Sequence, residues 1–294
     1  MKNIQIGLSQ WSFHRSILGD SRNNYEDFLS TLHSDNPEKT LRGEMDYEGL
    51  LDVAESIGVK VIDLVNILFF GRVSDERWLK AWKASAAERG ITFNCLMCDE
   101  LGPLGSSSDD KRADAIQKHK LWIDAANLLG CSMVRVNAYG DGSYFSQLNQ
   151  NALSISELSG YSEKYGIKIV VENHGHPSSN GAWLAMLMEH IADENVGVYI
   201  DFDNFFMGGW NHTPKRLYDR QQGLLDLAPY TFGASAKSYE FDEDGNETNV
   251  DFKQCIDILK EAGFSGVMSA EYEGDKHNEL DGVVSTLRLL RRII

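Results

Sequence analysis

The sequence predicts a single (β/α)8 barrel, and three features of the chain lead to this prediction. Eight apolar, strand-like runs alternate with amphipathic helical patterns along the 294 residues. The turns from a helix to the next strand are short, which is typical of parallel βαβ units. The loops after the strands are longer and polar, and in such a barrel these loops surround the active site.

The expected strands are apolar runs that end in polar residues, and the expected helices repeat their apolar residues with a helical period. The strands are Ile4–Gln10, Val59–Asn66, Ile91–Cys98, Met133–Ala138, Lys168–His174, Val196–Asn204, Tyr230–Ser238 and Gly266–Gly274. The helices are Met45–Ile57, Asp75–Arg89, Lys111–Leu129, Leu153–Tyr165, Ala182–Ile191, Asp251–Ala262 and Leu280–Ile293.

Glycine residues end many of the expected helices. Glycine adopts the left-handed conformation that closes a helix more readily than any other residue. Gly58, Gly90, Gly130, Gly166 and Gly263 stand at such positions. A doubly wound sheet is the alternative arrangement of these units, but no GxGxxG turn follows the first expected strand.

The length and composition agree with one domain that spans residues 1–294. A (β/α)8 barrel commonly takes about 250 residues. Only five prolines occur, and no linker rich in Ser, Gly or Pro divides the chain. Hydrophobic residues make up 42% and charged residues 24%, as in ordinary soluble proteins.

The charge of the chain argues against several classes of partner. It has 28 Lys and Arg against 44 Asp and Glu, a net charge of −16. Nucleic acids and anionic membranes bind cationic surfaces, so we expect neither as a partner. The first residues lack the apolar core of a signal peptide, which predicts a cytoplasmic location. The acidic surface and the Leu- and Ile-rich last helix are compatible with a homo-oligomer.

Two of the four cysteines, Cys95 and Cys98, form a CxxC motif within the third expected strand. Residues three apart on a strand point to opposite faces. We therefore expect buried thiols here rather than a zinc or redox site.

Carboxylates end the fifth, sixth and eighth expected strands. Side chains alternate along a strand, so Glu172, Asp201 and Glu271 are expected to converge at one mouth of the barrel. Like charges this close raise each other's pKa unless a cation neutralises them. A bound divalent metal is the simplest explanation, and oxygen ligands suit Mg²⁺, Mn²⁺ or Ca²⁺. A histidine ligand would favour Mn²⁺, Co²⁺ or Zn²⁺.

Other residues at the strand ends are candidates for the same site. His174 and His176 follow Glu172 into a loop, and Lys237 on the seventh strand needs a carboxylate or ligand partner if it is buried. Aromatic residues at the strand ends suit either a wall against a sugar ring or packing under long loops. They are Trp11, Phe13, Phe69, Phe70, Trp183, Phe205, Phe206 and Trp210.

Six short motifs in a fixed order run through nearly the whole chain. They are Gly7-Leu-Ser-Gln-Trp-Ser12, Ala125-Ala-Asn-Leu-Leu-Gly130, Val171-Glu-Asn-His-Gly175, Val198-Tyr-Ile-Asp-Phe-Asp-Asn204, Ser235-Ala-Lys237 and Ala270-Glu-Tyr-Glu-Gly274. With these motifs the chain resembles the xylose isomerase-like barrel superfamily of sugar isomerases and epimerases. That superfamily also includes inosose dehydratases and endonuclease IV.

The resemblance implies one divalent metal ion. Mn²⁺, Mg²⁺ or Co²⁺ is expected before Zn²⁺ as the ion that is bound. In that family a Glu, an Asp, a His and a Glu hold the ion, and they correspond here to Glu172, Asp201, Ser235 and Glu271. The histidine ligand is therefore replaced by serine, and Asn204 replaces another histidine common in the family. Without this histidine, the site could bind the metal ion through carboxylates and water, or use a histidine after the fifth strand as a ligand. It could also bind the ion weakly or contain no metal.

The resemblance also implies an isomerase or epimerase that acts on a small carbohydrate through an enediolate. Glu172 and Glu271 would remove and return a proton next to the carbonyl. Lys237 would stabilise the negative charge that develops on oxygen. The residues expected to hold the substrate are Asn137, His174, Asn204 and Trp11.

Two further functions stay open at this stage. The same site would be a keto-sugar or inosose dehydratase if the enediolate expelled a β-hydroxyl group. The serine at position 235 also leaves room for a carbohydrate-binding barrel without turnover. A DNA-repair endonuclease would need a histidine-rich metal cluster and a basic groove, which eight histidines and a net charge of −16 do not favour.

Overall fold

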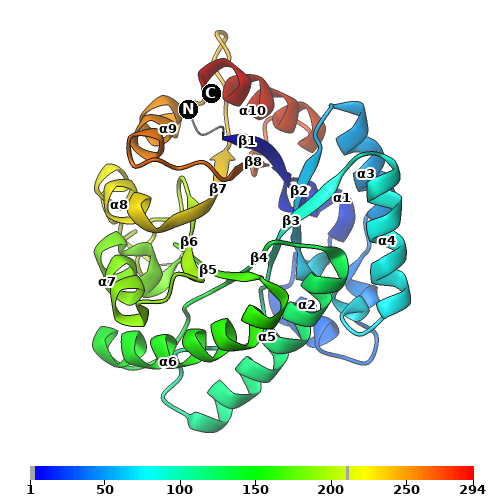
Figure 1. Ribbon diagram of the computed structural model, residues 1–294. Helices are drawn as coiled ribbons and strands as arrows, with labels where there is room; N and C mark the ends of the chain where they lie inside the picture. Colours follow the sequence, from blue (N-terminus) through cyan, green and yellow to red (C-terminus); the bar gives the residue numbers. More distant parts are fainter. Residues whose placement is uncertain (1–3, 210–211) are drawn as a thin grey trace.

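Eight parallel strands close into a barrel in the computed structural model, which describes residues 4–209 and 212–294 (Figure 1). Neighbours in the sequence are neighbours in the sheet, and β8 pairs with β1 to close it. The prediction of a single (β/α)8 barrel is confirmed. The strands are β1 (Gln5–Ser9), β2 (Val61–Val65), β3 (Thr92–Met97), β4 (Met133–Val136), β5 (Lys168–Glu172), β6 (Val196–Asp201), β7 (Thr231–Ser238) and β8 (Val267–Tyr272).

The helices form an outer ring around the strands (Figure 1). They are α1 (His14–Leu18), α2 (Tyr25–Leu32), α3 (Tyr47–Ser56), α4 (Glu76–Glu88), α5 (Asp109–Leu129), α6 (Tyr144–Ser162), α7 (Gly181–Ile191), α8 (Arg220–Leu227), α9 (Phe252–Glu261) and α10 (Glu279–Ile293). A short 3-10 helix, η1 (Gln10–Phe13), follows β1 directly. In the part of the chain that the structure describes, no helix is long and apolar enough to cross a membrane.

The glycines that the sequence places at helix ends all adopt the left-handed conformation, as predicted. Their φ angles lie between 67° and 85°. They turn the chain back into the next strand at the end of the barrel opposite the long loops. Those long loops are consequently left to form the other end, where the strands finish.

Three helices and one helix boundary differ from the prediction. The unexpected helices α1, α2 and α8 have eight residues or fewer, so each shows about two turns of the helical period at most. Helix α6 begins at Tyr144, although the pattern predicts a helix only from Leu153. Its first turn is capped by Ser143 and exposes Phe145 by 75%, so it lacks the apolar stripe that marks a helix.

A buried polar layer crosses the inside of the barrel below the strand ends. The carboxylate of Asp63 on β2 accepts hydrogen bonds from the hydroxyls of Tyr199 on β6 and Ser269 on β8. Tyr199 and Ser269 each stand two residues before a carboxylate, Asp201 or Glu271. Because alternate residues share a face, those two carboxylates point into the next layer, at the mouth of the barrel.

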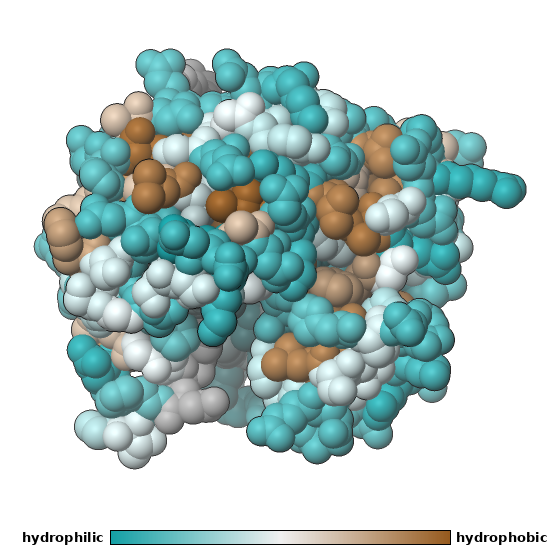
Figure 2. Space-filling model, turned by 90° about the horizontal axis from the view of Figure 1, so that it is seen from below, coloured by the Kyte–Doolittle hydropathy of each residue, from teal (hydrophilic) through white to brown (hydrophobic). Residues whose placement is uncertain are grey.

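The face in Figure 2 is largely hydrophilic, and its apolar side chains are interrupted by polar ones. All four cysteines are buried and free, as the sequence predicts for the CxxC pair Cys95 and Cys98. Burial raises the pKa of both thiols.

Candidate active site

A cavity of about 570 Å³ opens where the strands end. Five carboxylates and three cationic side chains line it. The carboxylates belong to Asp99, Glu100, Glu172, Glu271 and Glu273, and the cations to Arg22, Arg135 and Lys237. The wall of this cavity is therefore dominated by charge, and the positions of its cations decide what it can bind.

The sheet register explains why these side chains meet. Lys237 on β7 is the partner of Glu271 on β8, and Asp201 on β6 is the partner of Ser235 on β7. Ser235 and Lys237 are two residues apart and therefore point to the same side of the sheet. Glu172 is the last residue of β5 and pairs with Tyr199 of β6, two residues before Asp201.

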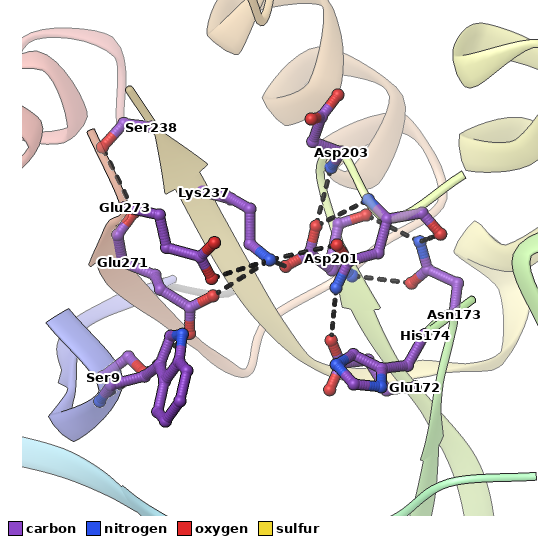
Figure 3. Close-up of polar contacts among 12 residues, drawn as sticks. Ser9, Glu172, Asn173, His174, Asp201, Asp203, Lys237, Ser238, Glu271 and Glu273 are labelled. Carbon is purple, nitrogen blue, oxygen red and sulfur yellow. Dashed lines mark hydrogen bonds and ion pairs between the residues drawn. The ribbon is translucent and has the colours of Figure 1, made fainter. Parts of the chain in front are cut away.

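One group of charges at the mouth is centred on a lysine, and we call Lys237, Asp201, Glu271 and Glu273 the Lys237 cluster (Figure 3). The ammonium Nζ lies 3.1 Å from Glu273 Oε1, 3.2 Å from Asp201 Oδ2 and 3.5 Å from Glu271 Oε1. Burial opposes the charge on Lys237, but the three carboxylates together outweigh it and raise its pKa. Lys237 is therefore a permanent cation at this site.

A second group is centred on an arginine, and we call Arg135, Asp99, Glu172 and Asn137 the Arg135 cluster. The guanidinium lies 2.6 Å from Asp99 Oδ1 through Nη1 and 2.8 Å from Glu172 Oε2 through Nε. Nη1 also donates to the Asn137 side-chain oxygen at 3.2 Å. Burial disfavours the charge on Asp99, but Arg135 outweighs it and lowers the pKa of this carboxyl.

Asn204 connects the two clusters behind the cavity wall. Its amide nitrogen donates to Glu172 Oε1 at 2.9 Å, and its amide oxygen accepts from Lys237 Nζ at 3.0 Å. Asp201 also lies behind the wall and is fully buried. Its Oδ1 accepts from the backbone N–H groups of Asp203 and Asn204, which fixes the turn after β6.

The two glutamates that the sequence predicts as proton carriers differ in their partners. Ser9 Oγ donates to Glu271 Oε2 at 2.7 Å, and Lys237 is the cation near its other oxygen. Burial raises the pKa of Glu271 to about 7, partly offset by Lys237. Burial also raises the pKa of Glu172, against the effects of Arg135 and Lys237.

His174 faces the cavity as a neutral side chain. Burial and the nearby Arg135 lower the pKa of His174 to about 3. Its Nδ1 shares a hydrogen bond with the Tyr139 hydroxyl. A neutral imidazole can donate and accept hydrogen bonds at a sugar hydroxyl.

The rim of the cavity is built by the segment after β1. Trp11 of η1 stacks on His14, with ring centroids 4.5 Å apart. The Arg22 guanidinium lies 4.9 Å from the centre of the Trp11 ring. Tyr25 of α2 donates its hydroxyl to the carboxylate of Glu100, so α2 and the loop after β3 meet at the rim.

The structure gathers most of the predicted site residues around one cavity. Glu172, Glu271, Lys237, Asn137, His174 and Trp11 line it. Asp201 and Asn204 stand behind the lining and contact Lys237 instead. His176 is also part of the lining.

Of the two roles that the sequence left open for the aromatic residues at the strand ends, core packing accounts for most of them. Of the eight aromatic residues named from the sequence, Trp11 alone is among the residues that line this cavity in the described chain. Phe13, Phe69, Trp183 and Phe205 are buried beneath the loops. Trp210 lies outside the described residues.

Sequence reasoning missed several lining residues, for two reasons. Arg135 of β4 stands two residues before Asn137, so strand alternation places both on the same side of the sheet, but alternation does not show that Arg135 pairs with Asp99. Arg22 and Tyr25 lie in the long segment between β1 and α3, where no periodic pattern marks an approach to the mouth.

The arrangement of charges does not fit a divalent metal ion. Such an ion needs several oxygen ligands about 2.0–2.6 Å from one point. Here the Lys237 ammonium stands among Asp201 and Glu271, while Arg135 holds Glu172. Ser235 occupies the position that the resemblance assigns to a histidine ligand. Within residues 4–209 and 212–294, no group of three or more His, Cys, Asp or Glu is placed to hold a metal ion.

Comparison with known proteins agrees with this architecture. A family model described as xylose isomerase-like TIM barrel matches residues 51–293. The chain belongs to this family. A C-glycoside deglycosidase alpha subunit from Arthrobacter globiformis is 34% identical over 76 residues. That match covers 24% of this chain and only 22% of the relative's length.

Solved structures of xylose isomerase-like barrels share the fold at low identity. The IolI protein with a bound zinc atom has a TM-score of 0.69 and 16% identity, covering 99% of this chain and 98% of its own. The 3-keto-D-glucoside 4-epimerase YcjR from E. coli has a TM-score of 0.68 and 13% identity, covering 99% and 100%. The probable 3-DHS dehydratase AsbF from Bacillus anthracis has a TM-score of 0.65 and 13% identity, covering 98% and 99%.

Proposed function

We propose that the protein is an enzyme that isomerises or epimerises a small carbohydrate by proton transfer next to a carbonyl group. The position of Glu172 and Glu271 on opposite sides of Lys237, at one cavity, carries this proposal (Figure 3). Two carboxylates on opposite sides of a bound sugar can remove a proton from one face and return a proton to the other.

The other residues of the cavity have roles that follow from their chemistry. Removal of the proton gives an enediolate, whose negative oxygen is stabilised by the ammonium of Lys237. Asn137 and His174 hydrogen-bond substrate hydroxyls, and the ring of Trp11 packs against the apolar face of the sugar. Asp201 and Asn204 hold Lys237 in place from behind the wall.

The size of the cavity and the family support a small sugar as the substrate. Small-molecule sites commonly enclose about 300–1,000 Å³. The cavity of about 570 Å³ falls in that range. The structural neighbours include an epimerase of a keto-glucoside, which is a substrate with the required carbonyl group.

The predicted divalent ion, whether Mn²⁺, Mg²⁺, Co²⁺ or Zn²⁺, has no part in these steps. A zinc atom is bound in the related IolI structure. In this chain, however, protein cations hold the carboxylates that would bind the ion. The proposal therefore assigns the stabilisation of negative charge to Lys237.

A dehydratase is the second candidate function. The hydrogen-bonded pair of Tyr139 and His174 favours it, because this pair can hydrogen-bond a departing hydroxyl group, which leaves as water with the proton that a glutamate has taken from carbon. The same enediolate would then lose water instead of taking up a proton on carbon. The similar fold of a probable dehydratase is compatible with this route.

The proposal is tested by incubating the protein in D₂O with a panel of ketoses, inososes, 3-keto-glucosides and their phosphates. NMR detects the exchange of substrate protons for solvent deuterium. We expect deuterium at the carbon next to the carbonyl group of a substrate, with an isomer or epimer as product. Glu172→Gln and Glu271→Gln should each abolish the exchange, because an amide cannot accept the proton. Glu243→Gln, in an exposed acidic turn, is the matched control.

The outcomes separate the candidates. Loss of water with formation of a conjugated ketone would replace the isomerase by the dehydratase. Binding of a sugar without exchange or loss of water would indicate a carbohydrate-binding barrel. Full exchange in both Gln variants would contradict the roles of the two glutamates.

A further inference from the structure

Every oxygen of the three carboxylates predicted as metal ligands already has a partner in the protein. In Glu172, one oxygen accepts from Asn204 and the other faces Arg135 Nε. In Glu271, one oxygen accepts from Ser9 and the other faces Lys237 Nζ. Each oxygen of these two carboxylates thus lies next to a donor or a cation of the protein, which would compete with a metal ion for it.

The third carboxylate, Asp201, is also surrounded by groups of the protein. Its Oδ1 accepts two backbone N–H groups, and its Oδ2 lies 3.2 Å from Lys237 Nζ without a hydrogen bond of its own. This oxygen is fully buried, so it depends on the ammonium for its compensation. An uncompensated charge in such a place would be strongly unfavourable.

The ammonium of Lys237 has four oxygen atoms around it. Three belong to the carboxylates of its cluster, and the fourth is Asn204 Oδ1 at 3.0 Å. An ammonium has three N–H donors, so the longest contact, 3.5 Å to Glu271, is the one that a ligand oxygen can replace. Lys237 is only 4% exposed, and that small exposed part faces the cavity.

Ser235 supplies an independent observation that points to a ligand. Its hydroxyl is buried, lines the cavity and makes no hydrogen bond with the described residues. A buried polar group without a partner is expected to meet one when a ligand or water arrives. Ser235 and Lys237 share one side of β7, so both would meet the same ligand oxygen.

We propose that Lys237 replaces the divalent metal ion of this site, and that Lys237 and Ser235 together bind the carbonyl oxygen of the substrate. The proposal rests on the proposed function for its chemistry, whereas its claim about the resident cation stands on the geometry alone. It assigns this chain to metal-independent catalysis on a barrel whose structural neighbours include a zinc-bound protein.

The reaction balances without any additional reactant. A glutamate takes the proton from the carbon next to the carbonyl group, and the C–H electron pair becomes the C=C bond of the enediolate. The carbonyl π pair moves to oxygen, where the Lys237 ammonium and the Ser235 hydroxyl donate hydrogen bonds and keep their protons. The reverse flow of electrons takes a proton back onto carbon.

Metal binding is the direct test, and it needs no substrate. Wild type, Lys237→Met and Ser235→His are purified, treated with a chelator, exchanged into chelator-free buffer and titrated with MnCl₂ by calorimetry. Lys237→Met removes the charge but keeps most of the volume. Lys80→Met is the matched control, because Lys80 is exposed and pairs with Glu76 on the surface of α4.

We expect no saturable Mn²⁺ site in wild type, in Lys80→Met or in Ser235→His, where the ammonium is still present. In Lys237→Met the vacated carboxylates should bind one Mn²⁺ at least about a hundredfold more tightly than wild type. The change removes a like charge within about 4 Å of the ion, where charge–charge interactions are strong. Adding Ser235→His to this variant should tighten binding again, because it restores an imidazole ligand.

A saturable Mn²⁺ site in wild type overturns the proposal. This titration of the wild-type protein tests the proposal even if Lys237→Met does not fold. A folded Lys237→Met protein that binds no Mn²⁺ also overturns it. Turnover that a chelator stops and Mn²⁺ restores would contradict this proposal and leave the proposed function standing. A wild type that binds no Mn²⁺ and turns over no sugar would contradict the proposed function alone.

Discussion

The Arg135 cluster and the Lys237 cluster each compensate buried carboxylates with one cation, but the two cations differ in shape and in the contacts they make. Arg135 has a planar guanidinium that hydrogen-bonds Asp99 and Asn137 in fixed directions and lies 2.8 Å from Glu172 as an ion pair. Lys237 is a point charge that three carboxylates share at 3.1–3.5 Å. One cluster is therefore built for fixed geometry, and the other can exchange a partner.

This difference separates a positioning role from a catalytic one. The guanidinium of Arg135 orients Glu172, and Asn137 completes its contacts on the cavity wall. The ammonium of Lys237 has an excess of negative charge around it and one long contact, to Glu271. A substrate oxygen can enter the second cluster without breaking the first.

The largest effect is expected from Arg135→Met. It leaves Asp99 and Glu172 without their cation in a buried place, and breaking such a pair destabilises a protein by about 3–5 kcal/mol. Urea denaturation of the variant measures this loss. Arg72→Met, which breaks the surface pair with Asp75, should change the unfolding free energy by less than about 1 kcal/mol. Equal effects of the two changes would remove the distinction between the clusters.

Lys237→Met should reduce turnover, in addition to the loss of stability expected when the buried Asp201 loses its cation. Losing a donor to a developing oxyanion commonly lowers kcat about 10²–10³-fold. The KM for a sugar found to react should change far less, because neutral hydroxyls are held by other residues. Steady-state kinetics measure both values. A rise in KM at unchanged kcat would show that Lys237 binds the ground state only.

The stability on the acid side should depend on His119, which is buried on α5. Burial lowers the pKa of His119 to about 4, below the usual value of about 6.5. Above pH 6.5, His119 is neutral in both the folded and the unfolded protein. As the pH falls from 6.5 to 4, only the unfolded protein takes up the proton, so the free energy of unfolding decreases. The loss reaches about 3 kcal/mol, since one pKa unit corresponds to about 1.4 kcal/mol.

His119→Gln should remove this part of the pH dependence, measured by urea denaturation at several pH values. His190→Gln, at an exposed position on α7, is the control and should leave the dependence unchanged. If wild type and His119→Gln lose stability in parallel between pH 6.5 and 4, the buried histidine is not the cause.

The smallest effect is expected from Tyr25→Phe at the rim. Tyr25 is 44% exposed, and its hydroxyl contacts the carboxylate of Glu100. The unfolding free energy should change by about 1 kcal/mol or less, as for a typical hydrogen bond. The KM should rise a few-fold at constant kcat, because the rim touches the ligand and not the reacting atoms. A large fall in kcat would place α2 in the catalytic machinery.

The fold was predictable because its signals are local and periodic. The strands end within a few residues of their predicted ends, and Gly58 and Gly130 close helices as expected. Helix α6 began earlier than predicted because the exposed Phe145 gives its first turn no apolar stripe. The short helices α1, α2 and α8 show about two helical turns at most and so give no clear periodic signal.

The carboxylates and Lys237 were predictable as residues of one site, but the contacts that their side chains make were not. Strand alternation alone brought Glu172, Asp201 and Glu271 to one mouth. It says nothing of how far a long side chain reaches, so it did not reveal that Lys237 lies among these carboxylates or that Arg135 binds Glu172. Those contacts depend on the packing of side chains between neighbouring strands.

Anomalous diffraction from wild-type crystals grown with MnCl₂ would show whether Lys237 or a metal ion is the cation at the mouth of the barrel. We expect the ammonium of Lys237 between Asp201, Glu271 and Glu273, and no manganese peak at the mouth of the barrel. A manganese peak bound by Glu172, Asp201 and Glu271, with Lys237 displaced from them, would contradict it.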